Sequence, residues 1–177
     1  MSAMTRFARP SLLPGFILVA TIMACGGAGD QKAADTTTTT PAPAATTASA
    51  GEQLFQQRCI SCHQANGEGI PGTYPPLAGS EYAAAPSPAA AIRIVLHGIQ
   101  GPITVKGAQY NSLMPAYGVG VVMTDEEIAS LLTYVRSSFG NNASAVTAAD
   151  VAKEREATAS HSGAMTAELL EPLIKGQ

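Results

Sequence analysis

Apolar residues recur at helical spacing in three separate segments of this chain. The first segment follows Gly51, the second lies between Pro88 and Gly98, and the third follows Thr124. Spacings of three and four residues place side chains on one face of an α-helix, so the pattern predicts three amphipathic helices. Their apolar stripes are Leu54, Phe55 and Cys59 in the first, Ile92, Val95 and Leu96 in the second, and Ile128, Leu131, Leu132 and Val135 in the third.

Local signals mark the ends of the second and third predicted helices. Ser87 and Pro88 are typical of an N-cap followed by a first-turn proline. Thr124 and Glu127 have the spacing of a capping box at the start of the third helix. A glycine in a left-handed conformation commonly ends a helix. The glycines that we expect in this role are Gly98 and Gly140.

Signals for β-strands are weak along the whole chain. Residues 103–105, with the sequence Ile-Thr-Val, come nearest to a strand, but the run is short. Beyond Gly140, two further short helical patterns begin at Thr147 and Thr166. We therefore expect an all-α fold with a C-terminal helical extension over residues 141–177, which packs on the domain, docks a partner or stays mobile.

The N-terminal segment has the composition of an export signal. Arg6 and Arg9 precede an apolar run of about a dozen residues, which is too short to span a bilayer. The run ends at Ala24-Cys25-Gly26-Gly27, which resembles the lipobox of bacterial lipoproteins, where a signal peptidase cuts before a cysteine that becomes diacylated. We expect residues 1–24 to be a lipoprotein-type signal peptide and Cys25 to carry the lipid. The alternatives are a plain signal peptide, with Cys25 a free thiol, or a buried core helix.

A segment of low complexity follows Cys25. Between residues 30 and 50, 17 of 21 residues are Ala, Thr, Pro or Ser, and there is no periodic apolar face. Such a segment buries too little apolar surface to offset the entropy lost on ordering. We therefore expect residues 25–50 to be a disordered tether that holds a domain at the periplasmic side of a bacterial cell membrane. Without the lipid, the protein would be soluble in the periplasm.

The composition suggests a core that is short of bulky side chains. Hydrophobic residues make up 46% of the chain, but aromatic residues make up only 5% and tryptophan is absent. Large aromatic residues normally contribute much of the buried area of a core. Either part of the chain does not fold, or a group other than protein fills the centre. The formal net charge of −3 argues against nucleic acid as a partner, since that partner requires a basic face.

The string Cys59-Ile60-Ser61-Cys62-His63 carries the strongest chemical signal in the chain. A C-x-x-C-H sequence is typical of covalent c-type haem attachment. Two thiols three residues apart near a helix end can reach both vinyl groups of one porphyrin, and the adjacent histidine can bind the iron. The alternatives are a thioredoxin-like dithiol, a zinc site and a strained disulfide. The first lacks a βαβ pattern, and for zinc the only other histidines are His97 and His161.

The motifs that follow resemble, in order and in spacing, those of the bacterial class I c-type cytochromes. The resemblance covers residues 51–140 and implies a cytochrome c fold, in which small helices wrap around one covalently bound haem c. It also implies that the helix after Thr124 crosses the helix after Gly51. The motifs are Tyr74-Pro75-Pro76-Leu77-Ala78-Gly79, Arg93 to Gly98, Lys106-Gly107, Met114-Pro115-Ala116-Tyr117-Gly118, and Thr124 to Ile128 with Leu131, Tyr134 and Val135.

Two matches to the family concern the iron directly. The resemblance implies that His63 is the proximal ligand and that Met114 is the loop methionine that supplies the sixth ligand. A thioether favours ferrous iron and raises the reduction potential. The rival candidates for the sixth position are Met123, which immediately precedes a predicted helix, and His97, which lies in a last helical turn.

Other matches concern the surroundings of the haem. Pro75 corresponds to the family proline whose carbonyl accepts a hydrogen bond from the proximal histidine, although an ordinary turn proline is the alternative. Candidates for contacts to the haem propionates are Tyr74, Arg93, Tyr110 and Asn111.

The resemblance implies an electron carrier between periplasmic or membrane redox partners. Similar monohaem domains accompany quinoprotein dehydrogenases, copper nitrite reductases and terminal oxidases, so a tightly bound subunit of such a complex is the main alternative. A haem sensor or a peroxidase would need an open sixth coordination position. Because lysines are few, we expect docking to partners to be largely apolar around the exposed haem edge, or to use a basic patch on the partner.

Overall fold

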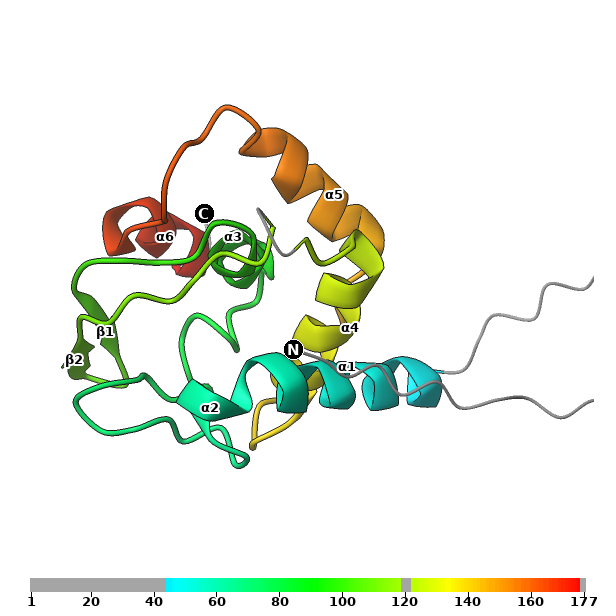
Figure 1. Cartoon of the computed structure of the whole chain (residues 1–177), viewed down its shortest axis with the longest axis horizontal. Coiled ribbons are helices and arrows are strands. Elements are labelled where there is room, and N and C mark those ends of the chain that lie inside the picture. The colour runs from blue at the N-terminus through cyan, green and yellow to red at the C-terminus, as the bar shows by residue number, and fades with distance from the viewer. Residues whose placement is uncertain (1–43, 119–121, 176–177) are drawn as a thin grey trace, which may run out of the picture. The chain divides into compact units, whose positions relative to one another are not determined.

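The computed structural model describes residues 44–118 and 122–175, all within one compact unit of the chain. The predicted signal peptide, Cys25 and the first part of the predicted tether lie outside these described residues. No described helix is long and apolar enough to cross a membrane. The described elements, in chain order, are α1 (Ala44–Arg58), α2 (Ile60–His63), α3 (Ala89–His97), β1 (Ile103–Val105), β2 (Ala108–Tyr110), α4 (Asp125–Ser137), α5 (Ala148–Ala157) and α6 (Ala167–Ile174) (Figure 1).

The described part of the chain is mostly helical, as predicted, but it also contains a small β-hairpin. Strands β1 and β2 pair antiparallel, with Ile103 opposite Tyr110 and Val105 opposite Ala108. Lys106 and Gly107 connect them with φ angles of 50° and 76°, the combination that a type I′ turn requires. The sequence pattern did not predict this hairpin, because three-residue strands are too short to show a clear alternation.

Helix α1 begins earlier than the sequence pattern predicted. It starts at Ala44, so the prediction of disorder up to residue 50 is wrong for residues 44–50. Four of these seven residues are alanine, which has the highest helix propensity. The low-complexity composition therefore concealed a helical extension of the amphipathic segment.

Helices α1 and α4 pack closely against each other, as the resemblance implied (Figure 1). Gly51 allows this approach, because a Cβ atom there would lie 2.8 Å from the Cβ of Tyr134 and closer still to the backbone of Ser130. Phe55 is fully buried beside the contact, with its ring 5.7 Å from that of Tyr134 and 5.1 Å from that of Phe139. This aromatic cluster fixes the position of α2, which follows α1 after a single residue.

The ends of α3 and α4 follow local sequence chemistry. Thr124 and Glu127 form the predicted capping box, in which each side chain accepts the other residue's backbone N–H. Helix α4 ends at Ser137, three residues before Gly140. Helix α3 ends before Gly98, whose φ angle is +73°. The start of α3 differs slightly from the prediction, because Pro88 occupies the N-cap position and Ser87 Oγ accepts the N–H of Ala89.

The C-terminal extension packs on the rest of the described domain. Helix α5 contacts α3 and α4, and α6 contacts α3. Thr147 and Asp150 form a second capping box at the start of α5. The apolar side chains that this extension buries are Val146, Val151, Met165 and Leu170.

Arg136 of α4 is the largest fully buried side chain in the described structure. Its guanidinium donates to the carbonyl oxygens of Ala83 and Ala85, each at 2.9 Å, and to Ser144 O at 2.9 Å. Burial lowers the pKa of this guanidinium. The contacts join the loop before α3 to the segment after α4, so a buried charge is solvated by backbone carbonyls. The sequence pattern gave no sign of this role.

Candidate cofactor site

A large, mainly apolar cavity lies between α2, α3, α4, the β-hairpin and the loops that follow α2 and β2. It contains about 1290 Å³ of empty space, counting its open mouth. A concave, mainly apolar lining with a few converging polar groups is typical of a ligand or cofactor site. The predicted site residues that line it are Cys59, Cys62, His63, Tyr74, Pro75, Tyr110 and Met114.

Cys59 and Cys62 reach the cavity because they lie on one turn of backbone, with Cys59 at the N-cap of α2 and Cys62 within it. The carbonyl oxygen of Cys59 accepts the N–H of Cys62 at 3.2 Å and that of His63 at 2.9 Å. Both thiols are free and partly buried. Burial, followed by the charge of Cys62 and opposed by Arg58, raises the pKa of Cys59 to about 12. The structure has no disulfide between these two cysteines, so both sulfur atoms are available for a covalent bond.

His63 is buried and held by one ring nitrogen. Its Nδ1 lies 3.0 Å from the carbonyl oxygen of Pro75, to which it donates as the neutral tautomer. Burial lowers the pKa of His63, and the bond to Pro75 opposes this effect. The neutral imidazole is thus favoured, and Nε2 is left as the nitrogen that can bind a metal.

Gly69 makes room for the carbonyl that holds His63. Its φ angle is +67°, and a Cβ there would lie 2.6 Å from the oxygen of Pro75 and even closer to that of Tyr74. Ile70 and Tyr74 form a β-bridge that closes this loop. The position therefore requires glycine both for its backbone conformation and for lack of space.

Met114 lies in the loop after β2 and lines the same cavity as His63. Its N–H donates to the oxygen of Ile99 at 2.9 Å, and its carbonyl accepts the N–H of Ile99 at 3.1 Å. A Cβ at Gly98 would lie 3.0 Å from the carbonyl carbon of Pro115, so the loop runs directly against the end of α3. These contacts fix the backbone on both sides of the methionine.

The two rival ligands do not line this cavity. Met123 is 1% exposed and packs in the main core cluster with α1 and α4. His97 Nε2 lies 2.7 Å from Thr158 Oγ1, away from the cavity and against the C-terminal extension. Among the described residues, no group of three or more His, Cys, Asp or Glu side chains is arranged to hold a metal ion.

Comparison with known proteins identifies the family. Residues 48–139, just over half of the chain, match the family model for cytochrome c. The chain is a class I c-type cytochrome. It is 40% identical over 102 residues to cytochrome c-552 of Thermus thermophilus, a match that covers 51% of this chain and 69% of that protein.

Two further relatives of the cytochrome are subunits of larger assemblies. The alcohol dehydrogenase (quinone) cytochrome c subunit of Gluconacetobacter polyoxogenes is 31% identical over 112 residues, which is 63% of this chain but 23% of that protein. The fructose dehydrogenase cytochrome subunit of Gluconobacter japonicus is 35% identical over 113 residues, which is 62% of this chain and 22% of that protein. The cytochrome therefore corresponds to less than a quarter of each subunit.

The cytochrome carries covalently bound haem c, and its function is electron transfer. The residues of the cavity fit this group. Cys59 and Cys62 provide two free thiols, and His63 provides an imidazole whose other nitrogen is already engaged. The remaining lining is mostly aliphatic and aromatic, with side chains from α3, α4 and the hairpin.

Two of the four candidate propionate contacts do not line the cavity. Arg93 is paired instead with Glu154 of α5, at 2.7 Å between Nε and Oε2, and does not line the cavity. The backbone carries Asn111 to an exposed position outside the cavity lining. Tyr74 and Tyr110 do line the cavity, and Tyr110 is buried there.

Two residues that hold the surroundings of the cavity had no sequence signal for that role. Tyr117 lines the cavity and donates its hydroxyl to the carbonyl of Arg58 at 3.0 Å, which joins the Met114 loop to the end of α1. Asn141 accepts the N–H of Gly79 at 2.8 Å and donates to the carbonyls of Leu77 and Val135. The buried amide of Asn141 therefore ties the loop below the cavity to α4. Its partner Gly79 lies 62 residues away in the sequence.

Proposed function

We propose that the cytochrome is an electron carrier, not itself an enzyme, in which His63 and Met114 bind the haem iron on its two faces. The observation that carries this proposal is that these two side chains line one cavity, whereas Met123 and His97 lie elsewhere. Two protein ligands would leave no open coordination position for a substrate. This favours electron transfer over the chemistry of a peroxidase or a gas sensor.

When bound, the haem supplies a one-electron couple between ferric and ferrous iron. The protein residues hold and shield that group. Pro75 orients the His63 ring, Ile99 holds the backbone of Met114, and the aliphatic residues of α3 and α4 exclude water. An apolar, water-poor lining and a thioether ligand both favour the ferrous state.

The mouth of the cavity supports an apolar docking mode for redox partners. Leu113 lines the cavity and is 63% exposed, and Ile70 on the neighbouring loop is also exposed. Exposed apolar side chains at a haem edge suit brief, weakly bound encounters. We propose that the partner is a dehydrogenase, reductase or oxidase, because relatives of this chain are named as dehydrogenase subunits.

A tightly bound subunit of such a complex is the second candidate. The observation that favours it is that several relatives are cytochrome subunits of alcohol, fructose or gluconate dehydrogenases. Purification of the full chain from its native membrane in detergent distinguishes the two. A free carrier loses its partner in high salt or dilution, whereas a subunit retains a dehydrogenase in fixed ratio.

We also propose that the mature cytochrome begins at Cys25 and is lipid-anchored at the periplasmic side of a bacterial cell membrane. The sequence Ala24-Cys25-Gly26 after an apolar run supports this location. Intact mass of the mature chain tests it. A diacylated species that starts at Cys25 supports the anchor, and an unmodified soluble chain contradicts it.

Carbon monoxide binding tests the electron-carrier proposal directly. The reduced full-length cytochrome is mixed with carbon monoxide, and the absorption spectrum is followed in time. A filled coordination sphere predicts slow or negligible binding under native conditions. Rapid and complete binding would show an open sixth position and would contradict the proposed function.

A further inference from the structure

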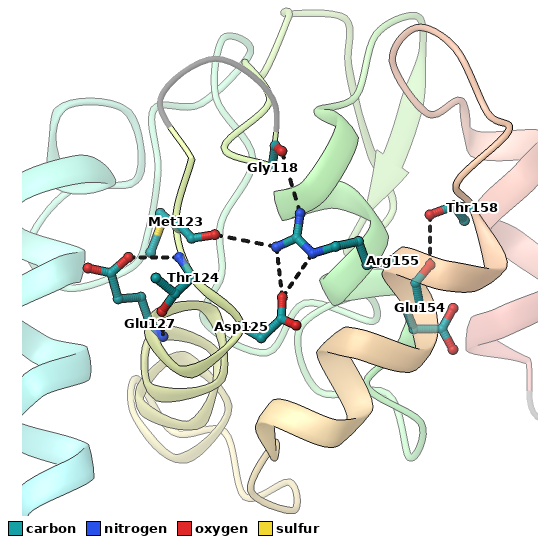
Figure 2. Close-up of polar contacts among 8 residues, drawn as sticks. All are labelled: Gly118, Met123, Thr124, Asp125, Glu127, Glu154, Arg155 and Thr158. Carbon is teal, nitrogen blue, oxygen red and sulfur yellow. Dashed lines mark hydrogen bonds and ion pairs between the residues drawn. The ribbon is translucent and has the colours of Figure 1, made fainter.

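The C-terminal extension contacts the loop that carries Met114, and the contacts centre on Arg155 of α5 (Figure 2). Its Nε and Nη2 atoms lie 2.9 Å and 2.8 Å from Asp125 Oδ1 at the start of α4. Nη2 also donates to the carbonyl of Met123 at 3.3 Å, and Nη1 donates to that of Gly118 at 3.5 Å. One half-buried guanidinium therefore bridges two backbone carbonyls and a carboxylate.

Both carbonyls belong to the backbone that continues from Met114. We call residues 111–118 the ligand loop. The N–H of Tyr117 donates to Val95 O at 2.8 Å, and the N–H of Gly118 donates to Leu96 O at 3.0 Å. The N–H of Met123 returns to the carbonyl of Tyr117 at 2.9 Å. Arg155 thus acts on the outer side of a loop whose inner side is hydrogen-bonded to α3.

There is little room for the ligand loop to shift at Gly118. A Cβ atom at that position would lie 2.6 Å from the oxygen and 2.9 Å from the Cα of Leu96. The loop is therefore in close backbone contact with α3. The hydrogen bond from Arg155 to Gly118 thus holds a closely packed segment. Three residues separate Gly118 from Met114.

The same extension also supports the other end of the ligand loop. Met165, between α5 and α6, donates its N–H to Gly98 O at 3.0 Å and accepts the N–H of Gln100 at 3.0 Å. Ile99, between those two residues, is the backbone partner of both Met114 and Met165. The extension therefore contacts the backbone that supports Met114 and the end of its loop.

We propose that Arg155 is a positioning residue for the sixth ligand, which holds the ligand loop closed so that Met114 stays on the iron. This inference rests on the proposed ligand role of Met114. Arg155 acts through Gly118 and Met123 and not by contact with the haem. The extension thereby limits access of external ligands to the iron.

A second ion pair on α5 provides a matched control. Arg93 and Glu154 also join α5 to the main domain, at 2.7 Å, and this pair is more buried than that of Arg155. Arg93 lies on α3, and its guanidinium hydrogen-bonds to Glu154 and not to the ligand loop. Arg155→Gln and Arg93→Gln each remove one guanidinium from one carboxylate. Both substitutions are expected to weaken the packing of the extension, but only Arg155→Gln is expected to increase the fraction of molecules in which Met114 has left the iron.

The test is spectroscopic titration of the full-length ferric cytochrome with imidazole, which competes with the methionine for iron. Apparent affinity for an external ligand rises in proportion to the population with the methionine displaced. Loss of a contact worth about 1 kcal/mol to the closed state lowers the apparent Kd for imidazole about fivefold. We expect this change in Arg155→Gln, a smaller one in Arg155→Lys, and wild-type affinity in Arg93→Gln.

Three results would overturn the proposal. Wild-type imidazole affinity in both Arg155 variants would show that Arg155 does not hold the loop, even where the wild-type protein has a sulfur-to-iron charge-transfer band. If Arg93→Gln raises the affinity for imidazole as much as Arg155→Gln does, general loosening of the extension explains the higher affinity. If the wild-type protein lacks that band, Met114 is not the ligand and the proposed ligand set fails as well. Arg155→Lys keeps the test available where Arg155→Gln does not fold.

Discussion

Nδ1 of His63 donates a hydrogen bond to the carbonyl oxygen of Pro75, 3.0 Å away, and Gly69 leaves the space in which that carbonyl lies. The bond selects one tautomer of a buried imidazole and leaves its other nitrogen available as the proposed iron ligand. An imidazole that donates such a bond is a more basic ligand, which favours ferric iron. If His63 is the proximal ligand, as proposed, Gly69 influences the electronic state of the haem from outside the cavity lining.

We predict that Gly69→Ala displaces the carbonyl of Pro75, because its Cβ would overlap the oxygens of Tyr74 and Pro75. The expected results are a higher midpoint potential, from a weaker His63 donor, and a loss of about 3 kcal/mol in unfolding free energy. Redox titration and denaturant unfolding measure the two effects.

Gly72→Ala is the matched control for that substitution. Gly72 has a similar φ angle of +72°, but no atom lies within 4 Å of its would-be Cβ. Gly72→Ala should lower the unfolding free energy only by the backbone strain of an alanine at this φ angle, about 1 kcal/mol, and leave the midpoint potential unchanged. Equal potentials in wild type and Gly69→Ala would show that the His63–Pro75 bond does not tune the iron.

A second prediction concerns the contact between α1 and α4. Alanine in place of glycine inside a helix normally stabilises it by about 1 kcal/mol. At Gly51, however, the added Cβ would overlap the backbone of Ser130 and the Cβ of Tyr134. We expect overpacking to outweigh propensity, so that Gly51→Ala lowers the unfolding free energy by about 2 kcal/mol net.

Denaturant unfolding of the holoprotein measures this change. Gln53→Ala, an exposed position on the same helix, should change stability by less than about 0.5 kcal/mol. A stabilised Gly51→Ala variant would mean that the two helices are not in close backbone contact.

A third prediction uses His97, which contacts the extension and not the haem cavity. Burial lowers the pKa of His97, and the nearby charges of His161, Arg155 and Arg93 act in the same direction. The unfolded chain therefore takes up a proton at His97, near pH 6.5, before the folded chain does. The neutral form of His97 therefore stabilises the fold above about pH 6.5. This stabilisation is lost as the pH falls from there through the lower pKa of His97 in the folded protein.

The expected observation is a fall in unfolding free energy as the pH drops below about 6.5 that is smaller in His97→Gln. Glutamine can still donate a hydrogen bond to Thr158 Oγ1, which is the partner of His97 Nε2. Parallel curves for the two proteins over this range would exclude His97 as the source of the pH dependence.

Local chemistry explains which parts of the fold could be predicted from the sequence. The capping boxes of Thr124 and Thr147 and the stop at Gly98 depend on neighbours within a few residues, and the structure contains all three. The cavity residues Cys59, Cys62 and His63 lie within one turn of backbone, so their spacing alone placed them together.

The errors arose where long-range partners decide the outcome. The ion pair of Arg93, a candidate propionate contact, with Glu154, 61 residues later, is one partner that the sequence did not show. The hairpin depends on the cross-strand pairing of three-residue strands, for which the sequence shows no clear alternation. The start of α1 was hidden because alanine-rich composition is compatible with both a tether and a helix.

The ligand assignment of Met114 is tested most directly by the long-wavelength sulfur-to-iron charge-transfer band of the ferric holoprotein. We predict that the wild-type protein and Met123→Leu show the band. Met114→Ala should lack it and have a lower midpoint potential, because a thioether favours ferrous iron. A band that persists in Met114→Ala, or that disappears only in Met123→Leu, would contradict the proposed His63–Met114 ligation.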